Sequence, residues 1–183
     1  MEPGASALLP QIRTLAARGG GGYPSAMASV DLSDLPDLLA AGQRILGLDV
    51  GSKTVGLAVS DGGLMVATPV ETLRRTKIGP DAAALAKLIA ERGVGALVVG
   101  LPVNMDGSEG ARCQSVRQFA DNLLERFEIP IAFWDERLST AAVTRTMLDA
   151  DLSRKRRGEV VDKLAAAYIL QGALDALGHR RQG

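Results

Sequence analysis

A change of hydrophobic period between residues 73 and 81 is the feature that most constrains the fold of this chain. Before it, three short apolar segments are separated only by glycine-rich turns, which predicts three strands in an antiparallel meander. After it, helically spaced apolar residues alternate with short, continuous apolar runs. Such runs are typical of strands buried on both faces of a sheet. The chain therefore predicts an α/β fold in which helices flank a mixed five-stranded sheet.

The positions of the elements follow from these patterns. Strands are expected at residues 45–50, 54–60, 64–73, 96–101 and 130–134. Helices are expected at residues 81–92, 109–126, 140–150 and 160–177. Ser108 is the expected N-cap of the second helix, and a basic loop at residues 153–158 is expected before the last one. A short amphipathic helix within residues 32–41 would lead into the sheet.

The chain of 183 residues is long enough for one ordinary domain. We expect that domain at residues 43–178, after a disordered or weakly structured N-terminal extension, residues 1–42, and before a C-terminal tail, residues 179–183. No apolar stretch reaches about 18 residues, so no membrane-spanning helix is expected. We therefore expect a soluble, cytoplasmic protein.

Composition excludes several kinds of site. The 21 basic and 21 acidic side chains balance, which argues against a general electrostatic coat for nucleic acid but leaves a local basic patch open. The one cysteine, Cys113, argues against a cysteine-based metal site and fits a reducing compartment. The one histidine, His179, argues against a Ser-His-Asp triad or a histidine-ligated zinc site. Any metal ion here would be a hard cation held by oxygen.

Asp49 is a carboxylate near the end of an otherwise apolar strand, in the stretch ILGLDVGSKTVGLAVSD. Gly47 and Gly51 leave space beside it, and an isolated buried carboxylate is costly. One interpretation is a functional acid whose charge is completed by a ligand. The alternative is a turn aspartate that hydrogen-bonds the backbone of residues 51–54.

Two further carboxylates, Asp135 and Glu136, follow the last predicted strand in AFWDERLST. They lie on opposite faces in strand alternation, so only one can point toward Asp49. We favour Glu136, because it sits just past the strand end and has the longer side chain. Asp135 is kept as a second candidate, although it could instead pair with Arg137 or cap a helix that starts near Ser139.

Asp162 lies on the apolar, small-residue stripe of the last helix, the side expected to pack on the sheet. Three inward acids from different elements would repel one another unless a divalent cation joined them. The predicted metal ligands for Mg²⁺ or Mn²⁺ are Asp49, Glu136 and Asp162, with Asp135 as a further catalytic candidate. Such ions activate water and stabilise the leaving oxygen in phosphodiester cleavage.

Several polar residues near these acids are candidates for substrate binding. Lys53 and Thr54 follow the first strand and could meet a phosphate, and Asn104 lies in the loop LPVNMDGSEG. The full predicted set is Lys53, Asn104, Arg137, Arg154, Lys155, Arg156 and Arg157. The alternatives are a solvated turn for Lys53 and Thr54, a plain Asp106-Gly107 turn for the loop, and a solvated charge run for the basic cluster.

Four motifs, in order, carry a family resemblance: GLDVGSKTVGLAVSD, VVGLPVNMDGSEG, AFWDERLST and VVDKLAAAYILQ. They resemble the YqgF/RuvX family of bacterial pre-16S rRNA nucleases, also called Holliday junction resolvases, over roughly residues 44–177. The resemblance implies an RNase H-like fold, metal-dependent hydrolysis of phosphodiester bonds, and maturation of the 5′ end of small-subunit rRNA.

The family's site residues transfer to this chain position by position. The first-strand acid corresponds to Asp49, the DER motif to residues 135–137, and the late-helix acid to Asp162. Resolvase relatives have a further acid at the end of the fourth strand. Here that place is held by Gly100-Leu101-Pro102, so we expect a differently assembled metal site.

The favoured function is a metal-dependent nuclease acting on structured RNA, as a monomer or homodimer. The alternatives are a resolvase-type endonuclease acting on branched DNA and a non-catalytic RNA-binding factor in ribosome assembly. DVGSKTVG also resembles the phosphate-binding hairpin of actin-like ATPases. That group clamps nucleotide between two such domains, and this chain has room for one.

Overall fold

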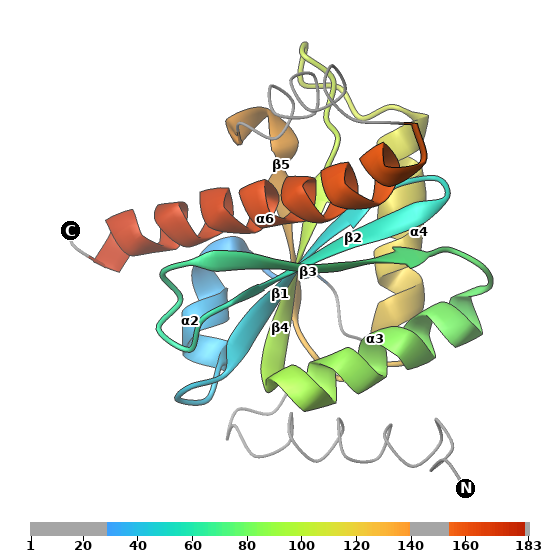
Figure 1. Ribbon diagram of the computed structural model, residues 1–183. Coiled ribbons are helices and arrows are strands. Elements are labelled where there is room, and N and C mark those ends of the chain that lie inside the picture. The colour runs from blue at the N-terminus through green and yellow to red at the C-terminus, as the bar shows by residue number, and fades with distance from the viewer. Residues whose placement is uncertain (1–28, 140–153, 182–183) are drawn as a thin grey trace, which may run out of the picture.

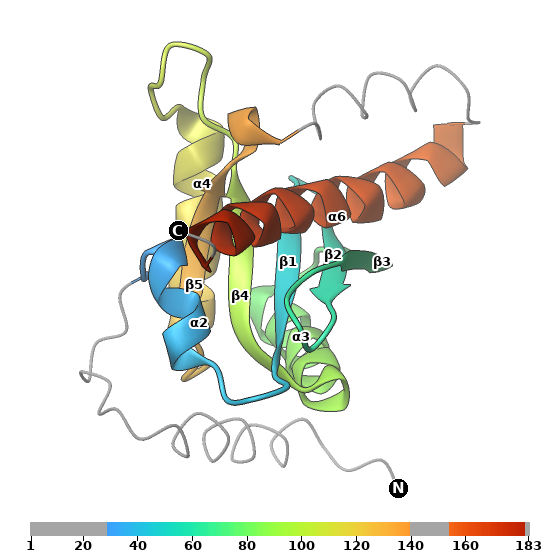
Figure 2. The same ribbon diagram turned by 90° about the vertical axis from the view of Figure 1, so that its left-hand side faces the viewer.

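Five strands form one sheet within residues 29–139 and 154–181, the parts of the chain that the computed structural model describes. The strands are β1 (Arg44–Val50), β2 (Thr54–Ser60), β3 (Ala67–Arg74), β4 (Val94–Leu101) and β5 (Ile131–Asp135). Figure 1 shows the sheet nearly edge-on, and Figure 2 shows its strands in the order β3-β2-β1-β4-β5. β1, β2 and β3 pair antiparallel, whereas β1, β4 and β5 are parallel. This arrangement confirms the predicted mixed, RNase H-like sheet.

Helices cover both faces of the sheet (Figure 2). The three long helices are α3 (Ile78–Arg92), α4 (Ala111–Leu124) and α6 (Arg154–Arg181). α3 and α4 pack on one face, where the core includes Leu48, Leu97 and Phe119. α6 packs on the other face, where Ile169 and Leu170 are fully buried. The sheet is therefore apolar on both sides, which explains the continuous apolar strands of the sequence.

The segment before β1 packs against the edge of the sheet that β5 forms. A 3₁₀ turn, η2 (Leu32–Asp34), and a short helix, α2 (Leu35–Leu38), lie within the range predicted for a helix. Leu35 is fully buried in the core under α6, and the N–H of Val30 donates to the carbonyl oxygen of Ile131 at 2.9 Å. None of the helices in the described ranges combines the length and apolar character needed to cross a membrane.

Several predicted boundaries differ from the structure, and three of the differences have a clear local reason. α6 begins at Arg154, so the predicted basic loop is helical from that residue on. Arg and Lys are good helix formers, and the single glycine of this stretch, Gly158, costs a long helix only about 1 kcal/mol. The N-cap of α4 is Gly110 rather than Ser108, whose hydroxyl donates to Asp106 instead. β3 begins at Ala67, because the Asp61 carboxylate accepts three backbone N–H groups and folds residues 63–66 into a turn.

The predicted end of α3 agrees with the structure, although α3 begins at Ile78 rather than at residue 81 and α6 ends at Arg181 rather than at residue 177. α3 ends where Gly93 adopts a left-handed conformation, with φ of 63°, and donates its N–H to the carbonyl of Ile89. The helix predicted at residues 140–150 lies outside the described residues.

Candidate active site

Glycines line the face of the sheet on which α6 lies. A β-carbon at Gly47 would meet the side chain of Leu170, and one at Gly56 would collide with the backbone carbonyl of Asp162. A β-carbon at Gly100 would meet the side chains of Ile169 and Glu136. We call Gly47, Gly56 and Gly100 the glycine row. It lets α6 approach the strands so closely that helix backbone rests on strand backbone.

Asp49 lies on this same face, because it follows Gly47 by two residues along β1. It is only 5% exposed, although carboxylates are seldom buried so completely. On one side its register partner is Gly56 of β2. On the other, the pairing of Leu48 with Val99 places Asp49 beside Gly100 of β4. The glycines that flank this acid are therefore Gly56 and Gly100 of the neighbouring strands, and not Gly47 and Gly51 as its sequence context suggested.

Glu136 occupies the space above Gly100. Its Oε1 lies 2.8 Å from the position that a β-carbon at Gly100 would take. Adjacent strands lie about 4.8 Å apart, so this carboxylate and Asp49 are neighbours on the α6 face, at the carboxyl ends of the parallel strands. Gly100 thus makes room for a carboxylate that follows the end of β5.

Asp162 reaches the sheet from the start of α6. Its carbonyl oxygen lies over Gly56, the register partner of Asp49. Its Oδ2 accepts a hydrogen bond of 2.6 Å from Oγ1 of Thr54, the first residue of β2. Thr54 therefore faces a carboxylate of the chain itself, which the sequence did not indicate.

Asp135 lies apart from these acids and is engaged with Arg137. Its carboxylate accepts bonds from Nε of Arg137 at 3.0 and 3.1 Å and from Nη2 at 2.6 Å. It also accepts the backbone N–H of Arg137 at 2.9 Å and so caps η3 (Glu136–Leu138). These contacts, chiefly the side-chain hydrogen bond, lower the pKa of Asp135. The geometry gives this acid the alternative role that we considered, and it brings Glu136 to the α6 face.

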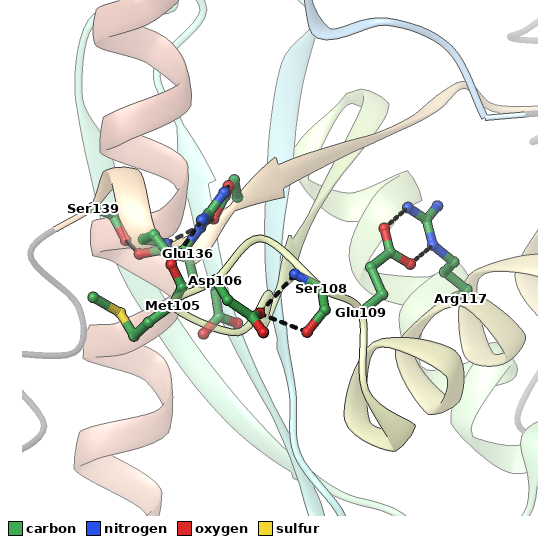
Figure 3. A network of polar contacts seen from close by, with 9 residues as sticks. Met105, Asp106, Ser108, Glu109, Arg117, Glu136 and Ser139 are labelled. Atoms are coloured by element: carbon green, nitrogen blue, oxygen red, sulfur yellow. Dashed lines mark hydrogen bonds and ion pairs between the residues drawn. The ribbon is translucent and has the colours of Figure 1, made fainter.

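The loop between β4 and α4 lies beside η3 (Figure 3). Asn104 closes it: its side-chain amide donates to the hydroxyl of Ser108 at 3.0 Å, and its carbonyl accepts the N–H of Gly107. Hydrogen bonds from Ser108 lower the pKa of Asp106. Nη1 of Arg137 reaches the carbonyl of Met105 at 3.5 Å and joins the loop to η3. Asn104 and Arg137 thus shape this rim of the site.

The turn between β1 and β2 is held by a residue that the sequence did not single out. Nη1 of Arg75 donates to the carbonyl of Gly51 at 2.6 Å, and the N–H of Arg75 donates to the carbonyl of Lys53 at 2.8 Å. The guanidinium also lies 5.0 Å from the ring centre of Phe119 on α4. Lys53 is exposed at the tip of this fixed turn. No motif marks Arg75, because its partners come from two distant segments.

The basic cluster Arg154–Arg157 forms the first turn of α6. Asp162 follows Arg154 by about two helical turns on the same helix, since a turn contains 3.6 residues. The backbone of the cluster and Asp162 therefore belong to one continuous helix.

These acids fit a metal site in which the protein supplies only one or two ligands better than a site in which protein side chains supply all of them. Among the described residues, no group of three or more Asp, Glu, His or Cys side chains could hold a metal ion, so the predicted set of Asp49, Glu136 and Asp162 is not assembled as three ligands of one ion. Mg²⁺, however, is commonly bound by one or two carboxylates and completes its shell with water and substrate phosphate. Asp49 and Glu136 supply hard oxygen donors on one face, so their chemistry suits Mg²⁺ or Mn²⁺.

Comparisons with known proteins give a consistent result. The model of a family described as "RuvX: Holliday junction resolvase" matches residues 43–176. A "Putative pre-16S rRNA nuclease" of Paramagnetospirillum magneticum is 65% identical over 137 residues, covering 75% of this chain and 88% of the relative. One of Rhodospirillum centenum is 62% identical over 162 residues, covering 86% and 85%. RuvC of T. thermophilus in complex with a Holliday junction substrate aligns with a TM-score of 0.49 and 16% identity, over 77% of this chain and 96% of that one.

Proposed function

Since this chain belongs to the RuvX family of Holliday junction resolvases, we propose that it is a divalent-metal-dependent nuclease that processes the 5′ end of pre-16S rRNA. As a family member it is a hydrolase of nucleic-acid phosphodiester bonds. The two bacterial relatives described above carry the name "Putative pre-16S rRNA nuclease", which supports an rRNA precursor as substrate. Such a reaction would take place in the cytoplasm.

The observation that carries the proposal is the burial of Asp49 beside Glu136. Two neighbouring carboxylates, one of them only 5% exposed, repel each other, and a divalent cation bound between them would relieve that repulsion. An Mg²⁺ or Mn²⁺ ion bound there would polarise the phosphate and lower the pKa of bound water.

The other residues have distinct tasks in this proposal. Asp49 and Glu136 would hold the ion, and Asp162 would flank it from α6. Lys53, on its fixed turn, and the basic cluster at the start of α6 would position backbone phosphates. Asp135 would hold Arg137 against the loop that Asn104 closes, and thereby shape the edge over which the substrate lies.

Cleavage assays with active-site variants test the proposal. Wild-type protein, Asp49→Asn, Glu136→Gln and the control Asp121→Asn, an exposed acid of α4, would be incubated with a structured RNA that spans the 5′ end of a 16S precursor. Each reaction would be run with Mg²⁺, with Mn²⁺ and with a chelator. We expect metal-dependent cleavage that falls about 100-fold or more in the two site variants and persists in the control. Full activity of Asp49→Asn would refute the catalytic assignment.

A branched DNA substrate, tested in parallel, separates the alternatives. Preferred cleavage of paired sites in the DNA would favour a resolvase, and such an enzyme would be expected to act as a two-fold dimer. Tight RNA binding without cleavage under any metal condition would favour the non-catalytic assembly factor.

A further inference from the structure

Thr54 makes a direct side-chain contact with an acid of the proposed active site. Its hydroxyl donates to Oδ2 of Asp162 at 2.6 Å, and both side chains are half-buried. The two residues lie 108 positions apart in the chain, so this bond joins the β1–β2 hairpin to α6. A hydroxyl-to-carboxylate bond of this length is in the short, charge-assisted range.

The surroundings of Asp162 explain why this bond can form. Gly56 lies two residues after Thr54 on the same face of β2, and the backbone carbonyl of Asp162 rests on it. Gly56 is also the register partner of Asp49. The backbone of α6 at Asp162 therefore lies over the cross-strand pair of Asp49 and Gly56. The bond from Thr54 holds the Asp162 carboxylate on the side of this pair that faces the β1–β2 turn.

We propose that Thr54 is a positioning residue, whose hydroxyl holds the Asp162 carboxylate beside the divalent cation that Asp49 and Glu136 would bind. The inference rests on the proposed function. Groups that hydrogen-bond metal-binding carboxylates fix their direction, and their loss typically weakens metal affinity or activity by about 10- to 100-fold. A purely structural contact between β2 and α6 would not require a hydroxyl, because a valine would fill the same volume.

Two substitutions separate the hydroxyl from the shape of the side chain. Thr54→Val keeps the β-branched shape that suits a strand and removes the donor, whereas Thr54→Ser keeps the donor and removes the methyl group. Thr68→Val, at an exposed position of β3, is the matched control. Mn²⁺ binding to each purified protein would be measured by titration calorimetry, and thermal unfolding would be recorded in the absence of metal.

We expect Thr54→Val to bind Mn²⁺ about 10- to 100-fold more weakly than wild type, with Thr54→Ser and Thr68→Val close to wild type. Equal affinity of Thr54→Val and wild type would overturn the inference, as would an equal loss in Thr54→Val and Thr54→Ser. Wild-type protein that neither binds Mn²⁺ nor cleaves would instead overturn the proposed function, and this inference with it. Binding by wild type together with unchanged binding by Thr54→Val would overturn the inference alone.

Discussion

Asp135 and Glu136 are consecutive acids with opposite surroundings. The Asp135 carboxylate is bound by the side chain and backbone of Arg137, whereas Glu136 extends over Gly100 toward the α6 face. They belong to different elements, since Asp135 ends β5 and caps η3, whereas Glu136 is the first residue of η3. The two acids should therefore respond differently to substitution, one through stability and the other through activity.

Asp135→Asn tests the stabilising role of the first acid. Because the pKa of Asp135 is lowered in the folded protein, its charge stabilises the fold above its ordinary pKa of about 3.9 and ceases to do so as the pH falls through the lowered value. We expect wild type to exceed Asp135→Asn by about 1 kcal/mol in free energy of unfolding near neutral pH.

The difference should shrink as the pH falls below about 4, and urea unfolding across a pH series would measure it. Asp121→Asn would serve as the control. If the difference in free energy of unfolding increased as the pH fell, the assigned role of the Asp135 and Arg137 pair would be contradicted.

At the scale of elements, the packing of α6 depends on the glycine row. A side chain at Gly56 has no flexible neighbour to displace, because it would meet the backbone of α6 at Asp162. We expect Gly56→Ala to lower the free energy of unfolding by about 1–3 kcal/mol through overpacking, and to reduce cleavage by displacing Asp162. Denaturant unfolding and the RNA cleavage assay would measure both effects.

Gly178, also in α6, supplies the matched control. A β-carbon there would meet nothing within 4 Å, so Gly178→Ala should be neutral or stabilising by up to about 1 kcal/mol. If Gly56→Ala were as stable as Gly178→Ala, the close backbone contact between α6 and β2 would be refuted.

The elements could be predicted wherever their own sequence determined them. All five strands follow from apolar runs and turn glycines, and the end of α3 follows from Gly93. The start of β3 could not be predicted, because Met65 and Val66 read as strand residues although they are 65% and 57% exposed. The Asp61 carboxylate determines their conformation by accepting their backbone N–H groups. Local hydrogen bonding of this kind overrides an apolar pattern.

The site could be predicted only in part for a similar reason. The inward faces of Asp49 and Asp162 follow from strand and helix periodicity. The bond from Thr54 to Asp162 and the two contacts of Arg75 with the β1–β2 turn depend on how distant segments meet. Periodicity predicts on which face of a strand or helix a side chain lies, but the packing of distant segments determines which residue it contacts.

At the scale of the whole molecule, binding of nucleic acid must rely on local charge, because the net charge is zero. We expect replacement of Arg154–Arg157 by glutamine to weaken RNA binding and to flatten its salt dependence. Each lost phosphate contact lowers the slope of log K against log salt by about 0.7–0.9. Fluorescence anisotropy over a series of salt concentrations would give the slope.

A control variant with the same change of net charge would have glutamine at Lys77, Lys87, Arg92 and Arg126, which lie on or beside α3 and α4. Its salt slope should stay near that of wild type. Equal slopes for the two variants would show that the start of α6 has no special part in binding.

The bond between Thr54 and Asp162 also has a consequence for biosynthesis. The proposed catalytic centre combines a hairpin made early in translation with a helix made 108 residues later. A nascent polypeptide therefore lacks a complete centre until α6 has left the exit tunnel. Cleavage of ribosomal RNA by a nascent chain would thus have to await the emergence of α6.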